Sequence, residues 1–320
     1  MRLGVLVPPV GRHAGAPEDW PLGRAALQLS RDGIDVVLIS SVVNGRLVGH
    51  RAQPGAWVSW GPGTVSGVLD RYPSRSRPAE YEALKVALGD TVVVNDPASV
   101  TLCADKVATQ RVWEGAGLPV PEIEVAPDRF ADAVSLWEVA FLKPRFGAFG
   151  HGIRRVQRGD ATPAFAEGAV LGTTEPTFLQ RAVAPLEPWA GACFRLLVQR
   201  EVQGWVAPVP IVRRSLTDPV VNAARGAEVC LATEMCTDVG PMTALGIRAA
   251  EALAQHAGGD AVVELGIDVV CDRDGKPWLL EANGRPQGRL EVLSRQDGVW
   301  QQAHMDATTR PLRALARLIR

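Results

Sequence analysis

Within the segment 264–286, Asp268, Glu281 and Asn283 carry oxygen donors at the spacing that two paired strands would need. Asp268 and Glu281 lie thirteen residues apart, and Asn283 follows two residues after Glu281. Largely apolar runs precede and follow the turn-forming residues 272–275. This pattern predicts a β-hairpin whose two strands are joined by that turn.

Antiparallel pairing in such a hairpin would bring Asp268 and Glu281 side by side on one face. Asn283 would point the same way, because side chains two residues apart on a strand share a face. Two carboxylates this close repel each other, and a divalent cation is the natural reason to tolerate them. Since carboxylate and amide oxygens suit Mg²⁺, the sequence predicts a metal site formed by Asp268, Glu281 and Asn283.

The composition is that of a soluble globular protein. The chain has 320 residues, enough for two or three domains, and is 47% hydrophobic and 22% charged. A net charge of −1 supplies no field that would attract nucleic acid or an anionic membrane, and the apolar runs are too short to span a bilayer. Five scattered cysteines without a Cys-x-x-Cys motif are expected to be free thiols. We therefore expect a cytoplasmic protein with no nucleic-acid or membrane partner.

The N-terminal part has the pattern of an open α/β layer. Residues 2–10 are expected to form a first buried strand, 21–31 a helix, and 35–43 a continuous apolar strand covered on both faces. The segment 44–78, rich in Gly, Pro and Trp, is expected to be irregular with short strands. The character of the chain changes near Asp96, which we take as a domain boundary.

Beyond Asp96 the chain alternates between helices and strands. The expected strands are 118–125, 139–143, 177–183 and a paired antiparallel set at 193–199 and 205–211, and the expected helices are 105–116, 237–256 and 310–320.

Two lysines and a glycine-rich loop are candidates for binding phosphate. Lys143 ends an apolar strand and precedes the loop 147–152, whose backbone N–H groups have no Cβ to block an anion. The loop spacing is neither a Walker A loop nor a dinucleotide fingerprint, so an ordinary turn remains open. Lys106 begins a helix, and a solvated surface lysine is its alternative reading. His151, inside the loop, is the one histidine worth testing.

The segment 180–183 follows an apolar strand and has two interpretations. Its backbone edges are placed to pair with an adenine ring, or it is simply the buried end of the strand. Glu187, a few residues on, is a candidate to bind ribose hydroxyls. We find no Gly-x-Ser-x-Gly elbow and no Ser-His-Asp arrangement.

Several arginines are candidates to bind anions. Arg195 lies between apolar residues and needs an anionic partner, either a structural carboxylate or a ligand phosphate or carboxylate. One of Arg213 and Arg214 is expected to reach the site while the other is solvated. Arg285 and Arg289, just past the predicted metal ligands, are placed to bind an acidic substrate by bidentate pairing.

Taken in order, these pieces resemble the ATP-grasp superfamily over roughly residues 96–295. The local sequence of these motifs is most similar to that of the endospore-coat-associated ATP-grasp proteins and less similar to that of ribosomal-protein glutamate ligases and glutathione synthetase. The resemblance implies an α/β chain with the α+β ATP-grasp fold. It implies an N-terminal α/β pre-ATP-grasp domain at 1–95, a central subdomain at 96–183 and a C-terminal subdomain at 184–320, the last two clamping ATP.

The resemblance also implies roles for individual residues. ATP and Mg²⁺ would be bound, with Asp268, Glu281 and Asn283 as the metal ligands. The implied nucleotide contacts are Lys106, Lys143, Gly147, Phe149, Gly150, His151, Gly152, Gln180, Arg181, Val183, Glu187 and Asn222. Arg195 would face the transferred phosphate, and it joins Arg213 and Arg285 as the catalytic candidates. Two positions depart from the family pattern: Cys193 replaces a frequent acid, and residues 225–227 replace a double glycine.

The implied activity is an ATP-dependent carboxylate–amine ligase that works through an acyl phosphate and releases ADP and phosphate. Two alternatives stay open: a Mg-ATP-binding structural or regulatory protein, and a small-molecule kinase on the same scaffold. The partners would be a small-molecule or peptide carboxylate and an amine. Their identity, the role of residues 44–78 and a homodimeric state are not decided by the sequence.

Overall fold

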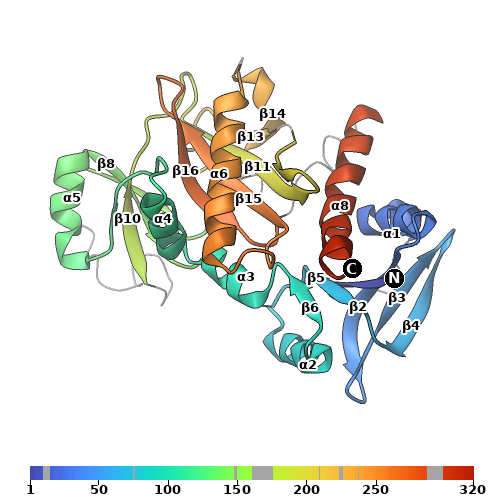
Figure 1. Cartoon of the computed structure of the whole chain (residues 1–320). Coiled ribbons are helices and arrows are strands. Elements are labelled where there is room, and N and C mark those ends of the chain that lie inside the picture. The colour runs from blue at the N-terminus through green and yellow to red at the C-terminus, as the bar shows by residue number, and fades with distance from the viewer. Residues whose placement is uncertain are drawn as a thin grey trace.

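The computed structural model describes residues 1–9, 15–74, 76–147, 150–160, 176–208, 210–222, 226–236, 238–286 and 298–320. In this part of the chain, three β-sheets follow one another, with helices packed against them (Figure 1). The mixed α/β fold class that the sequence predicts is confirmed.

The first sheet is built from the N-terminal part of the chain, in the strand order β4-β3-β2-β1-β5-β6. Its strands are β1 (Arg2–Leu6), β2 (Asp35–Val43), β3 (Arg46–Gln53), β4 (Ala56–Gly63), β5 (Gly67–Asp70) and β6 (Val92–Val94). Val36 and Leu38 of β2 pack in one core with α1 (Pro21–Arg31), whereas Val37 and Ile39 pack in another with α2 (Pro78–Leu88). The apolar run of β2 is thus covered on both faces, as expected.

The segment 44–78 is more regular than the sequence suggested. It contains the long antiparallel hairpin β3–β4, paired from Gln53 and Ala56 at the turn to Leu47 and Gly63 at the open end. Gly55 closes the turn with φ of 75°, a backbone conformation that glycine adopts without strain. The expectation of an irregular segment was wrong because many of its Gly and Pro residues mark the ends of strands instead of interrupting them.

The second sheet has the antiparallel strand order β7-β10-β8-β9. Its strands are β7 (Ile123–Glu124), β8 (Val139–Pro144), β9 (Arg154–Gln157) and β10 (Thr177–Arg181), and the helices of this region are α3 (Pro97–Ala104), α4 (Lys106–Gly115) and α5 (Phe130–Trp137). Helix α4 begins at Lys106 because the Asp105 carboxylate caps it, accepting from the backbone N–H groups of Val107 and Ala108 at 3.1 Å each.

The third sheet has the order β14-β13-β11-β15-β16, with β12 paired to β11. Its strands are β11 (Gly191–Glu201), β12 (Gly204–Val206), β13 (Ile211–Ser215), β14 (Glu228–Leu231), β15 (Glu264–Cys271) and β16 (Pro277–Asn283). Helix α6 (Gly240–His256) packs on β11, β15 and β16. The Trp113 indole donates to the Ala249 carbonyl at 3.1 Å, which joins α4 to α6.

Helix α8 (Gly298–Leu318) brings the C-terminal end of the chain back to the first sheet, where it lies beside α1 (Figure 1). Leu312 and Leu315 are buried in one core with Leu3 and Val5 of β1. The core of the first sheet therefore draws on both ends of the sequence. The domain boundaries near residues 95 and 183 stay predictions.

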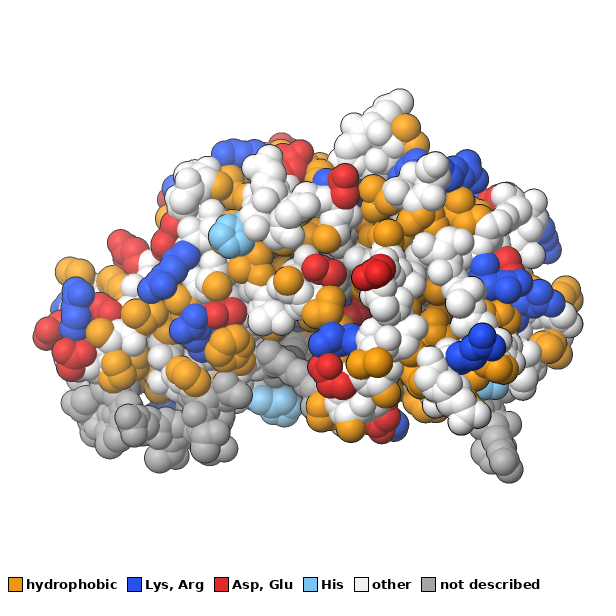
Figure 2. Space-filling model, turned by 60° about the horizontal axis from the view of Figure 1, so that its bottom comes forward, with side chains coloured by type: hydrophobic (Ala, Val, Ile, Leu, Met, Phe, Trp, Pro, Cys, Tyr) orange, Lys and Arg blue, Asp and Glu red, His pale blue; other side chains and the backbone are white. Residues whose placement is uncertain are grey.

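The surface and the thiols agree with the composition. Acidic and basic side chains both occur across the face in Figure 2, without an expanse of one sign. All five cysteines are free. Among the residues described, no helix combines the length and the apolar character needed to cross a membrane.

Candidate active site

The predicted hairpin is confirmed in its register. Strands β15 and β16 are antiparallel, with Asp268 opposite Glu281 and Gly266 opposite Asn283. A β-bulge follows Asp268. At the turn, the Asp272 carboxylate accepts from the N–H groups of Asp274 at 3.1 Å and Lys276 at 2.9 Å. The two carboxylates consequently lie side by side on one face of the sheet.

Two arginines from neighbouring strands pair with Asp268. Arg195 lies opposite Asp268 in the register of β11 and β15, and its Nη2 donates to Asp268 Oδ2 at 2.8 Å while its Nε donates to Oδ1. Arg213 Nη2 lies 2.9 Å from the same Oδ2. The Asp268 carboxylate is thus one anionic partner of Arg195, and a contact with a ligand anion stays a prediction.

A glycine makes room for this pairing. A Cβ on Gly266 would lie 3.2 Å from Arg195 Nη1 and 3.4 Å from its Cδ. The Arg195 guanidinium group therefore lies over β15 at Gly266, the position that has no side chain. Sequence reasoning missed this function of Gly266, although a glycine in a strand interior signals close approach by another group.

The two carboxylates differ in their electrostatic environment. Asp268 is 2% exposed, and burial opposes its ionisation, but Arg195 and Arg213 outweigh that effect and keep the pKa of Asp268 below its ordinary value. Desolvation and the Asp268 charge together raise the pKa of Glu281, although Lys106 acts in the opposite direction. A divalent cation would reverse the effect on Glu281, because it favours the ionised form.

The two predicted lysines lie near these carboxylates, Lys106 at the start of α4 and Lys143 on β8 of the second sheet. Lys106 Nζ lies 4.0 Å from Glu281 Oε2 and donates to the Gly147 carbonyl at 2.7 Å. Lys143, on β8, donates to Gln180 Oε1 at 2.5 Å. Desolvation lowers the pKa of Lys143 to about 8, with Glu281 opposing the shift.

A cleft of about 470 Å³ lies between the second and third sheets. One wall comes from β8, β10 and the segment after β10, and the other from β11, β13, β15 and β16. Phe141, Ile153 and Val183 give it apolar surface, while Asp268 and Glu281 give it charge. A cleft of this size with a few convergent polar groups is typical of a small-molecule site.

Most of the predicted site residues meet at this cleft. Those that line it are Lys143, Gly150, Gln180, Arg181, Val183, Arg213, Asn222, Asp268 and Glu281. Lys106 and Arg195 contact its lining carboxylates, and Gly147 accepts from Lys106. Phe149 and Arg289 lie outside the described residues.

Of the other predicted site residues that the structure describes, five do not line the cleft: His151, Gly152, Glu187, Asn283 and Arg285. The Glu187 side chain is 81% exposed and lies 4.0 Å from Arg273. The Asn283 side chain has a buried Nδ2 without a hydrogen-bond partner among the described residues. This nitrogen is a donor, so binding of a cation by Asn283 would use the amide oxygen.

The architecture matches known proteins over nearly its whole length. A family model described as YheC/D like ATP-grasp matches residues 179–304. The crystal structure of D-cycloserine synthetase DcsG has a TM-score of 0.67 and 21% identity, covering 99% of this chain and 100% of that one. The chain has the ATP-grasp fold.

Two further structures with this fold are similar. D-alanyl-alanine synthetase A from Vibrio cholerae has a TM-score of 0.58 and 14% identity, covering 96% of this chain and 98% of that chain. The ATP-grasp ligase PsnB, solved with a minimal precursor, Mg and ADP, has a TM-score of 0.56 and 16% identity, with coverage of 96% and 98%. The narrower likeness to the endospore-coat-associated proteins stays a prediction.

Within this ATP-grasp fold, Arg285 contacts the N-terminal sheet. Its Nη2 donates to Asp70 Oδ2 at 2.6 Å and to the Tyr81 hydroxyl at 3.0 Å, and its Nη1 donates to Ser74 Oγ at 2.8 Å. Asp70 ends β5 and is fully buried. The cation expected to bind an acidic substrate is thus already paired with a carboxylate, and substrate binding by Arg285 stays a prediction.

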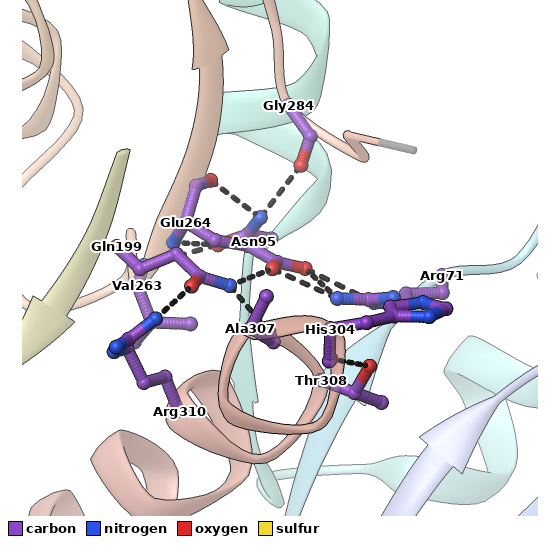
Figure 3. Close-up of polar contacts among 10 residues, drawn as sticks. All are labelled: Arg71, Asn95, Gln199, Val263, Glu264, Gly284, His304, Ala307, Thr308 and Arg310. Carbon is purple, nitrogen blue, oxygen red and sulfur yellow. Dashed lines mark hydrogen bonds and ion pairs between the residues drawn. The ribbon is translucent and has the colours of Figure 1, made fainter. Parts of the chain in front are cut away.

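A second buried network connects the same open end of the hairpin, away from its turn, to the N-terminal sheet (Figure 3). Glu264, which begins β15, is fully buried and accepts from Arg71 Nη2 at 2.6 Å and from Gln199 Nε2 at 3.1 Å. Asn95, just after β6, donates to the carbonyls of Glu264 at 2.8 Å and Gly284 at 2.6 Å. The ATP-grasp hairpin is therefore fixed from β5 and β6, a link the sequence did not reveal.

A third contact missed by sequence reasoning lies at the start of the glycine loop. Arg145 Nε and Nη2 donate to the two oxygens of the Asp105 carboxylate at 2.8 and 2.6 Å. Asp105 also caps α4, so one carboxylate connects the loop to the helix that carries Lys106. An acidic residue at a helix start and an arginine after a strand were the available signals.

Proposed function

We propose that this chain is an ATP-dependent ligase that joins a carboxylate to an amine. The observation that carries the proposal is the adjacent pair Asp268 and Glu281, which faces a cleft that Lys143 also lines. The structures with the same fold that are named as synthetases and ligases support amide-bond formation. The domain organisation proposed from the sequence fits this use, with the cleft between the central and C-terminal subdomains.

ATP and Mg²⁺ fit the groups present. The cleft volume of about 470 Å³ lies within the range usual for ligands of this size. Asp268 and Glu281, with the Asn283 amide, would bind Mg²⁺, which would neutralise the charge of the phosphates. Among the described residues, no cluster of three or more His, Cys, Asp or Glu side chains is placed to bind a metal. A site of two carboxylates and an amide would leave coordination positions for phosphate oxygens.

The reaction we propose has two steps. A carboxylate oxygen of the first substrate attacks the γ-phosphorus of ATP, the bond to the bridging β,γ-oxygen breaks, and an acyl phosphate and ADP form. The amine of the second substrate then attacks the acyl carbon, the bond to the phosphate oxygen breaks, and the nitrogen loses a proton that ends on the departing phosphate. The products are an amide and inorganic phosphate.

The side chains of this chain would act mainly through position and charge. Lys106 and Lys143 would place cationic groups against the phosphates, and Arg213 would add a third from β13. Arg195 would keep Asp268 ionised and correctly oriented. No side chain is required as a covalent nucleophile, and the Cys193 thiol that lines the cleft is kept protonated because burial raises its pKa to about 12. A closed cleft would also protect the acyl phosphate from water.

The proposal is tested by measuring ADP release over pairs of carboxylates and amines, including amino acids and short peptides, with mass analysis of the products. A ligase gives ADP only when both substrates are present, together with an amide product. ADP with a stable phosphorylated product would indicate a kinase instead. Binding of Mg-ATP with no turnover for any pair would favour a structural or regulatory protein.

We expect the affinity for ATP to fall as the pH rises through about 8. The free protein loses the Lys143 proton near this pH, whereas bound phosphates would favour the charged amine and raise its pKa. One linked proton weakens binding by at most about tenfold per pH unit. Calorimetric Kd values between pH 6.5 and 9.5 measure this, with Lys143→Arg as the variant expected to flatten the profile. A wild-type profile without a slope above pH 8 would contradict the role of Lys143.

A further inference from the structure

A continuous line of side-chain hydrogen bonds leads from the cleft into the interior. Lys143 Nζ donates to Gln180 Oε1 at 2.5 Å, and Gln180 Nε2 donates to Gln110 Oε1 at 3.0 Å. Gln110 Nε2 then donates to the Pro121 carbonyl and, at 3.2 Å, to Glu114 Oε1. Gln180 is 2% exposed and Gln110 is 1% exposed, so water does not replace these bonds.

The Pro121 carbonyl, the last acceptor, determines how the amide groups of Gln110 and Gln180 are oriented. The Pro121 carbonyl can only accept, so it requires the NH₂ end of Gln110. The oxygen end of Gln110 must then face Gln180, and it accepts the NH₂ group of that side chain. The remaining oxygen of Gln180 is thereby directed at Lys143.

The opposite orientation of Gln180 would place donors against donors. A turned amide would present its NH₂ group to the Lys143 ammonium and its oxygen to the Gln110 oxygen, leaving four buried groups badly paired. Gln110, on α4, does not line the cleft, whereas Gln180 and Lys143 do. Its effect on a ligand is therefore transmitted through Gln180.

We propose that Gln110 is a positioning residue that places the Lys143 amine for the nucleotide phosphates by orienting the Gln180 amide. The proposal rests on the proposed function, in which Lys143 contacts ATP. Both ends of the Gln180 amide are hydrogen-bonded inside the protein, so this side chain acts on Lys143. Hydrogen bonds to the adenine ring would then come from the neighbouring backbone.

The test compares Gln110→Met with the wild-type chain. Methionine matches glutamine in length but supplies neither the donor nor the acceptor. We expect Gln110→Met to raise Kd and KM for ATP about tenfold while kcat changes less than about twofold, because the lost contact concerns binding of the ground state. Gln255→Met on the exposed face of α6 is the matched control and is expected to leave both constants unchanged.

A second substitution separates positioning from general damage. Glutamate at position 180 has two equivalent acceptor oxygens, so its contact with Lys143 does not depend on which way the group is turned. The carboxylate also adds negative charge to the cleft, so Gln180→Glu alone is expected to weaken ATP binding. We expect Gln110→Met to raise Kd less than about threefold in the Gln180→Glu background, against about tenfold in the wild-type background. If Gln110→Met has the same effect in both backgrounds, the positioning function is wrong.

The outcomes also distinguish this inference from the proposed function. Absence of ATP binding by the wild-type chain overturns both, whereas wild-type binding with an unchanged Kd in folded Gln110→Met overturns the inference alone.

Should Gln110→Met not fold, Gln110→Glu replaces it: the protonated acid can donate to Pro121 and accept from Gln180. Burial at this position and the neighbouring Glu114 carboxylate favour the protonated acid. The variant is therefore expected to bind ATP near wild-type affinity at pH 5.5 and about tenfold more weakly at pH 8. If the ratio of the variant Kd to the wild-type Kd is the same at pH 5.5 and pH 8, the inference is overturned.

Discussion

The Glu281→Gln variant is expected to release ADP at least about 10³-fold more slowly than the wild-type chain. The substitution keeps the size of the side chain but removes a charge that would bind the cation next to Asp268. Desolvation and Asp268 raise the pKa of Glu281, so the ionised form is unfavourable in the free protein. The thermal stability of the variant is therefore expected to be equal to or higher than that of the wild-type chain.

This prediction is measured as ADP release with an active substrate pair, alongside a thermal melt of both proteins. Glu251→Gln, at an exposed position of α6, provides the matched control and is expected to have wild-type activity. A Glu281→Gln variant that keeps more than about a tenth of the wild-type rate would exclude Glu281 as a metal ligand. Lower stability together with lower activity would instead indicate a structural contribution.

Replacement of Asn95 by Ala is expected to lower the free energy of unfolding by about 3–5 kcal/mol. The Asn95 amide donates to the carbonyls of Glu264 and Gly284 and accepts from the N–H groups of Val263 at 3.0 Å and Glu264 at 3.3 Å. All these groups are buried, so the variant would leave them without partners. Asn95 also has φ of 51°, which alanine adopts less readily.

Asn44→Ala separates the two contributions to this loss. Asn44 has φ of 50° but is exposed in the turn between β2 and β3. Its replacement is expected to cost only about 1 kcal/mol, the backbone part of the effect. Urea unfolding of both variants measures the difference. If the two losses were equal, the Asn95 hydrogen bonds would make no net contribution to stability.

The features that the sequence predicted well are those set by local patterns. The pairing of Asp268 with Glu281 follows from strand alternation and one turn, and the start of α4 at Lys106 follows from the capping acid before it. Most of the predicted site residues also line the cleft or lie next to residues that line it. These residues are constrained by neighbours in the sequence, and such constraints can be read without coordinates.

The features that escaped prediction depend on partners far apart in the chain. Arg285 and Asp70 are 215 positions apart, and no local pattern indicated that a carboxylate at the end of β5 would take this cation. Segment 180–183 was expected either to pair with adenine through its backbone or to be a buried strand end, and neither interpretation indicated that the Gln180 side chain pairs with Gln110, 70 positions earlier. In both cases a buried polar group had several chemically suitable partners, and only the packing of elements selects one.

The position of α8 has a consequence for synthesis of the protein. Leu312 and Leu315 complete the apolar interior beneath β1, although they are translated roughly 300 residues later than that strand. Until α8 has been synthesised, this side of the first sheet is covered by α1 alone, whose Ala26 and Leu29 belong to the same core. The core around β1 can therefore be completed only after the α8 residues have been synthesised.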